Sequence, residues 1–199
     1  MKKIIAMLLA LSMMTAFTAC GDDKEKDPTD TQNSTAEKAD ADSGDGAEAD
    51  SGEIFDAGNV NVMVPAGWKA FPVSDIFSEE ENATDPDGIQ VAKGAESEWD
   101  LLSKPYLDID FYDADTSGLL TPDKEWYDNA ADISPLTTGD LTWEGFSAVS
   151  FEMPMTIIWT TDSEGNQYQV TIWTEMTDGN ISLDDADVQA ILASLSPSA

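Results

Sequence analysis

The chain has no histidine, no arginine and a single cysteine, Cys20, among its 199 residues. A histidine base, a free thiol nucleophile and an arginine clamp for an oxyanion are therefore missing. The sequence also lacks a Gly-x-Ser-x-Gly turn and a glycine-rich phosphate loop. A pair of carboxylates suffices for glycoside hydrolysis, but among 40 acidic residues some pair arises by chance. We therefore expect a protein that is not an enzyme, with an acid-pair hydrolase as the remaining catalytic alternative.

Positive charge is scarce as well. Nine lysines stand against 40 acidic residues, which gives a formal net charge of −31. Proteins bind phosphate backbones and anionic lipids by displacing counterions with lysine and arginine, so nucleic acid is excluded as a partner. The acid excess keeps the protein soluble, or it attracts cations such as Ca²⁺ or a basic partner.

The N-terminal residues have the pattern of a targeting segment. Lys2 and Lys3 precede an apolar stretch, 4–16, which is shorter than the roughly 20 residues of a membrane span. Phe17-Thr18-Ala19-Cys20 follows, and the segment resembles a bacterial lipoprotein signal, although leucine is usual at the position of Phe17. The resemblance implies that residues 1–19 are removed and that Cys20 carries a diacylglyceryl thioether and often an N-acyl chain. We therefore expect a protein that is lipid-anchored to the cell membrane on its extracytoplasmic side.

Beyond Cys20 the composition divides the chain in two. Residues 20–52 are rich in Asp, Ala, Ser, Thr, Glu and Gly and contain no aromatic residue, so this segment should be a disordered acidic tether. Residues 53–199 hold all the tryptophans and tyrosines and are long enough for one domain.

Strand patterns dominate this domain. Alternation of polar and apolar residues is clearest over 106–112, where Leu107, Ile109 and Phe111 should face inward while Asp108 and Asp110 face outward. The expected strands are 59–64, 88–92, 106–112, 141–143, 146–153, and a hairpin of 155–161 with 167–176.

Two helices are expected to complete the domain. One begins at Thr121-Pro122-Asp123 and runs through Trp126 to Ala130, and the other is capped by Ser182. The apolar positions of the second helix recur at helical spacing, at Val188, Ile191, Leu192 and Leu195. The predicted fold class is α+β, an antiparallel sheet flanked by helices.

Several segments together resemble the PsbP-like lipoproteins. They are a strand running into Val64-Pro65-Ala66-Gly67-Trp68, the pair Trp126-Tyr127, the stretch from Asp140 to Phe146, the long hairpin, and the closing helix from Val188 to Leu195. The likeness covers 53–196. It implies an α/β/α sandwich that serves as a binding scaffold, and it carries over no catalytic residues.

One loop has a metal-binding pattern. Counted as an EF-hand, the segment from Asp113 to Lys124 places oxygen donors at Asp113, Asp115 and Ser117 and glycine at the sixth position. The twelfth position is Lys124 in place of the required glutamate, so the pattern favours an acidic strand-to-helix turn. Weak Ca²⁺ binding is the alternative, and no other cofactor is expected.

Trp173 is the remaining candidate for ligand contact. Its strand alternation places it opposite Tyr168, Val170 and Ile172, on a face that in a sandwich would lie under a helix. If that face is free, the indole can stack on a sugar or anchor a protein partner. The sequence thus predicts a surface lipoprotein with a non-catalytic protein-binding domain, with a Ca²⁺- or carbohydrate-binding module as the alternative.

Overall fold

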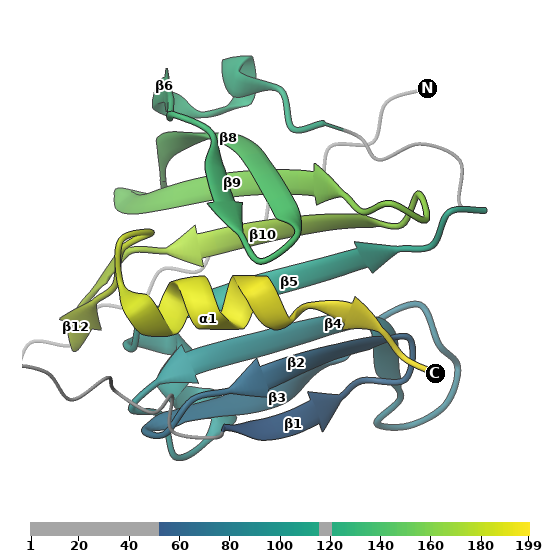
Figure 1. Ribbon diagram of the computed structural model, residues 1–199. Helices are drawn as coiled ribbons and strands as arrows, with labels where there is room; N and C mark the ends of the chain where they lie inside the picture. Colours follow the sequence, from purple (N-terminus) through teal and green to yellow (C-terminus); the bar gives the residue numbers. More distant parts are fainter. Residues whose placement is uncertain (1–51, 116–120) are drawn as a thin grey trace, which may run out of the picture. The chain divides into compact units, whose positions relative to one another are not determined.

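The computed structural model describes residues 52–115 and 121–199. Most of the secondary-structure elements in these residues are short strands (Figure 1). The strands are β1 (Glu53–Asp56), β2 (Val60–Val64), β3 (Trp68–Ser74), β4 (Thr84–Lys93), β5 (Tyr106–Tyr112), β6 (Asp128–Asp132), β7 (Leu136–Thr138), β8 (Leu141–Ser150), β9 (Met153–Thr161), β10 (Gln167–Trp173), β11 (Glu175–Met176), β12 (Gly179–Asn180) and β13 (Ser196–Pro197). The helical elements are α1 (Ala186–Ser194) and two 3₁₀ turns, η1 (Glu98–Leu102) and η2 (Lys124–Trp126).

An eight-stranded antiparallel sheet forms the body of the domain. Its strand order is β3-β4-β5-β10-β9-β8-β6, and β7 pairs with β8. β1, β2 and β13 form a second, three-stranded sheet, and β11 and β12 form a small hairpin. The expected hairpin of β9 and β10 is confirmed, and the turn between its strands is held by Asp162, whose Oδ1 accepts hydrogen bonds from the backbone N–H groups of Glu164 and Asn166, both at 2.9 Å.

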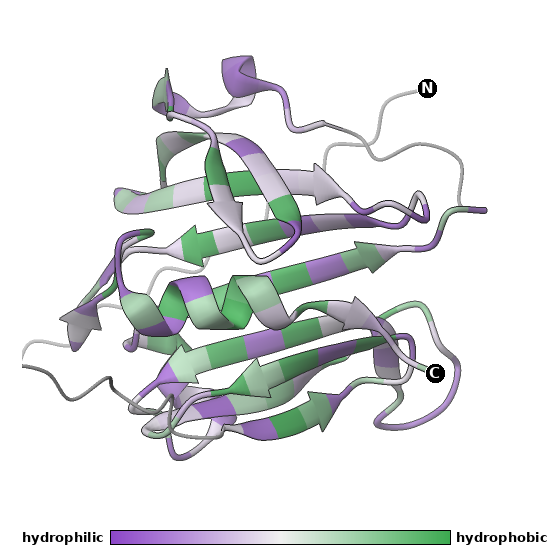
Figure 2. Ribbon diagram, in the orientation of Figure 1, coloured by the Kyte–Doolittle hydropathy of each residue, from purple (hydrophilic) through white to green (hydrophobic). Residues whose placement is uncertain are grey.

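The two faces of the large sheet follow from the alternation in its strands. Apolar and polar residues alternate along β5, as Figure 2 shows, and Leu107, Ile109 and Phe111 are buried as predicted. β10 contributes Tyr168, Val170 and Ile172 to the same side, in register with β5. α1 packs against this side and against β2, and its buried residues Val188, Ile191 and Leu192 complete the main core.

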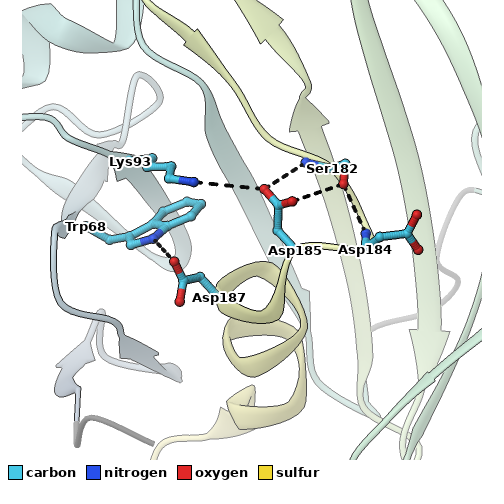
Figure 3. A network of polar contacts seen from close by, with 6 residues as sticks. All are labelled: Trp68, Lys93, Ser182, Asp184, Asp185 and Asp187. Atoms are coloured by element: carbon cyan, nitrogen blue, oxygen red, sulfur yellow. Dashed lines mark hydrogen bonds and ion pairs between the residues drawn. The ribbon is translucent and has the colours of Figure 1, made fainter. Parts of the chain in front are cut away.

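Polar contacts fix the start of α1 (Figure 3). The indole N–H of Trp68 donates to Asp187 Oδ2 at 3.0 Å, and the Lys93 ammonium lies 4.0 Å from Asp185 Oδ2 and over the Trp68 ring. Ser182 and Asp185 also bond to each other, so the predicted serine cap closes a turn just before the helix. Trp68 in β3 therefore joins α1 to the edge of the large sheet.

The prediction of an α+β sandwich with helices on both faces is wrong. Among the described residues α1 is the one α-helix, and it lies on one face of the sheet, so the fold is mostly β. The helix expected from Thr121 to Ala130 is a single 3₁₀ turn, η2, closed by a hydrogen bond from the Glu125 N–H to the Asp123 carboxylate at 2.9 Å. β6 then pairs with β8, and Asn129 takes a left-handed φ of 54°.

Tertiary packing explains this difference. The Tyr127 ring packs against Phe146 with centroids 5.6 Å apart, which favours an extended chain along β8 over a free helix. Trp126 of η2 is 80% exposed. The two short strands expected around Gly145 are one continuous strand, β8. Gly145 lets the backbone of β9 come close to β8 at this point, because a Cβ there would collide with the carbonyl oxygen of Ile157.

Candidate functional site

The face of the large sheet opposite α1 carries polar and aromatic side chains together. In an antiparallel pair, residues directly opposite each other project to the same side, so the register of β5 and β10 identifies the members of this face. All of them are half-buried. We call the following residues the open face: Tyr106, Asp108, Asp110 and Tyr112 on β5, and Gln167, Gln169, Thr171 and Trp173 on β10.

Trp173 stacks on Tyr106 at one end of the open face. The ring centroids are 6.0 Å apart and the planes are inclined by 25°. Trp173 also packs against a second small cluster that contains Phe146 and Met155. The strand alternation placed Trp173 correctly opposite Tyr168, Val170 and Ile172. A helix over its face was also expected, and within the described residues that expectation is wrong, because α1 packs on the other side.

Two carboxyl groups occupy the middle of the open face. Asp108 lies opposite Thr171 on β10 and Gln90 on β4, and Asp110 lies opposite Gln169. Burial raises the pKa of Asp108, and a hydrogen bond with Gln90 partly opposes that rise. Burial, together with the negative charges of Asp108 and Asp85, raises the pKa of Asp110 to about 6.

Burial and nearby carboxylates also raise the pKa values of Tyr106 and Tyr112, which flank these acids on β5. Burial and the charge of Asp108 raise the pKa of Tyr106 to about 12, and an interaction with Trp173 partly opposes this. Burial and the charges of Asp110, Asp85 and Asp87 raise the pKa of Tyr112. The charges that act on this face are thus all negative, and both tyrosines remain neutral hydrogen-bonding groups near neutral pH.

A hollow of about 180 Å³ opens at the Asp110 end of β5. It is lined by Asp85, Asp87, Asp110, Phe111, Tyr112 and Asp113. The Asp85 carboxylate accepts a hydrogen bond from the Asp87 N–H at 2.9 Å, and the Asp87 carboxylate accepts one from Asn59 Nδ2 at 2.8 Å. The hollow is therefore acidic and built by β4 and β5 together.

The predicted Ca²⁺ loop is only partly described. Asp113 and Asp115 follow β5, and Asp113 Oδ1 accepts a hydrogen bond from the Asp115 N–H at 3.0 Å, which is a local Asx turn. Ser117 lies outside the described residues, so the loop stays a prediction. Within 52–115 and 121–199, no group of three or more acidic or thiol side chains is placed to hold a metal ion.

Cys20 and the rest of the expected signal and tether also lie outside the described residues. In the part of the chain that the structure covers, no helix has the length and apolar character to cross a membrane.

From the sequence, Asp108 and Asp110 were predicted only to face outward, and neither was proposed as a candidate site residue. The sequence feature that could have indicated them is a strand in which two acids and two tyrosines, Tyr106 and Tyr112, share the outward face. The half-burial of these acids depends on β4 and β10 flanking β5, which is a property of strand order.

Comparisons with known proteins identify no family. No protein-family model matches the chain, and no curated protein is similar to it in sequence. A solved structure from Bacteroides thetaiotaomicron VPI-5482 is similar over 75% of this chain, with 9% identity and a TM-score of 0.40. The chain spans about half of that protein, since the match covers 49% of it.

Proposed function

We propose that this chain is a membrane-anchored extracytoplasmic lipoprotein whose domain is a non-catalytic protein-binding module, with the open face as its binding surface. The observation that carries this proposal is a sheet face that joins stacked aromatic rings to amide, hydroxyl and carboxyl groups on neighbouring strands. Tyrosine and tryptophan combine a large apolar surface with a polar edge, and this makes them common anchors at protein interfaces.

Asp108 and Asp110 invite comparison with the acid pair of a glycosidase. In such a pair one carboxyl must stay ionised as base or nucleophile while the other holds its proton. Here burial raises the pKa of both groups, and among the described residues no positive charge or backbone N–H counters it at either one. The rise is opposed at Asp108 by a hydrogen bond with Gln90 and reinforced at Asp110 by two carboxylates, so an acid-pair hydrolase stays the catalytic alternative to a binding role.

The anchor is tested by labelling the full chain with a radioactive fatty acid in producing cells. We expect label in the wild-type chain and none in Cys20→Ser, because the thiol is the attachment point. Labelling that persists in Cys20→Ser, or wild-type protein without label, would contradict the anchor.

The binding surface is tested by placing a photo-crosslinking amino acid at Gln169, in the open face, or at Ala193, an exposed residue of α1. We expect a discrete protein adduct from position 169 of the full chain in its own cells and none from position 193. No adduct at 169, or equal adducts at both positions, would place the interface elsewhere.

A further inference from the structure

We propose that the open face binds a cationic segment of the partner, with lysine or arginine side chains over Asp108 and Asp110. This inference rests on the proposed function and names the chemistry of the partner. It follows from three independent features of the face: its charges, its aromatic rings and an unpaired acceptor.

The first feature is uncompensated negative charge. Asp110 lies beside Asp108 on its own strand and near Asp85 on β4, and Asp87 lines the adjoining hollow. The described residues contain 29 acidic side chains and four lysines, a formal charge of −25. Two of these lysines are engaged elsewhere, Lys93 with Asp185 and Lys124 with Asp132. A cation from outside the described residues is therefore the complementary group for this face.

The second feature is the pair of aromatic rings next to these carboxylates. Tyr106 immediately precedes Asp108 in the outward-facing row of β5, and Trp173 stacks on it from β10. Trp159, half-buried on β9, lies opposite Gln169 on the same side of the sheet. Ammonium and guanidinium groups are attracted to the faces of such rings as well as to carboxylates. Rings and acids side by side therefore favour lysine and arginine.

The third feature is the side-chain oxygen of Gln167. Its Oε1 is buried, and no hydrogen-bond donor meets it among the described residues; the buried Nε1 of Trp173, at the other end of the open face, likewise meets no acceptor there. Buried acceptors are nearly always paired in folded proteins, and an unpaired one calls for a donor from outside. The N–H groups of lysine and arginine are such donors for Gln167, and a backbone carbonyl of the bound segment is an acceptor for the Trp173 N–H.

The size and shape of the face favour a protein segment over a single ion. The open face lies on β5 and β10, and Gln90 of β4 and Trp159 of β9 continue it on either side, over a width of about 14 Å at the usual strand spacing. Several side chains of an extended segment fit across this width. A basic peptide is therefore the natural probe.

The test measures binding of a ten-residue lysine peptide to the full mature chain in detergent by calorimetry. Asp110→Asn removes one negative charge from the open face, and Asp184→Asn makes the same change at an exposed residue on the α1 side. We expect Asp110→Asn to weaken binding about fivefold and Asp184→Asn to weaken it less than twofold. Wild-type binding should also strengthen from pH 5 to pH 7.5, and this dependence should shrink in Asp110→Asn.

Equal weakening by the two substitutions would show attraction to the overall charge and overturn the proposal. Binding of a neutral oligosaccharide in place of the lysine peptide would overturn it as well, in favour of a carbohydrate surface. A position-169 crosslink to a protein combined with no peptide binding would reject the cationic segment and leave the protein-binding function standing. Asp110→Asn is nearly isosteric, and its melting temperature, measured alongside, verifies that the variant is folded.

Discussion

At the scale of single residues, Asp110 occupies an environment that disfavours its charge. Burial and two neighbouring carboxylates raise its pKa to about 6, well above the value of 3.8 for an unperturbed aspartate. The folded chain therefore holds a proton on Asp110 at pH values where the unfolded chain has lost it. The contribution of this residue to stability is full below about pH 4 and declines as the pH rises through 6.

Asp110→Asn should accordingly stabilise the domain at pH 7.5, by about 2 kcal/mol once partial solvent access is allowed for. At about pH 3 the two proteins should have nearly equal stability, because wild-type Asp110 is then largely neutral in both the folded and the unfolded state. Urea denaturation at the two pH values measures the difference. A variant less stable than wild type at pH 7.5 would show that the carboxylate has a stabilising partner.

At the scale of elements, α1 depends on its attachment to β3. The hydrogen bond from the Trp68 indole to Asp187 is the direct polar link between the helix and that strand (Figure 3). Trp68→Phe removes this donor and part of the buried ring, so we expect a loss of about 2 kcal/mol in the free energy of unfolding. Asp187→Asn retains an acceptor oxygen and should cost less. Equal losses would indicate that the carboxylate charge, rather than the hydrogen bond, holds the helix.

The turn between β8 and β9 contains two residues with strained backbone conformations. Phe151 and Glu152 both take left-handed conformations, with φ of 52° and 66°, and Phe151 is 89% exposed. Two-residue hairpins of this kind favour Asn-Gly, since other side chains are strained there. The double change Phe151→Asn, Glu152→Gly should raise the free energy of unfolding by about 1 kcal/mol.

Phe151→Ala is the control for this turn, because it removes the exposed ring and keeps the Cβ that causes the strain. Thermal melts of the two variants separate these effects. If Phe151→Ala stabilises the domain as much as the double change does, the exposed ring, and not the backbone, is the source of the cost.

The same elements show what a sequence can and cannot reveal. Strict alternation predicted β5 to the residue, because one of its faces has only apolar side chains and the other has side chains with a polar group. α1 was also predicted, since its buried residues recur at helical spacing. η2 and β6 were missed: the local helix-start signal at Thr121-Pro122-Asp123 is real, but packing of Tyr127 on Phe146 outweighs it. The neighbours of β5, which turn two outward acids into a half-buried pair, are set by long-range pairing that no local pattern contains.

At the scale of the whole molecule, self-repulsion should be the dominant electrostatic effect. A formal charge of −25 on the described residues, with few compensating lysines, destabilises the compact state through mutual repulsion. Raising NaCl from 20 mM to 500 mM screens this repulsion, and we expect the melting temperature to rise by about 5 °C. A melting temperature that falls with salt would instead indicate that favourable ion pairs dominate.

The titration of Asp110 tests most directly whether the open face binds a cationic segment. Carboxyl carbon NMR on the isotopically labelled mature chain follows this residue alone and with the lysine peptide. We expect a midpoint of about pH 6 for the free protein, falling by about one pH unit when the peptide is bound. A midpoint near 4 in the free protein, or one that the bound peptide leaves unchanged, would contradict it.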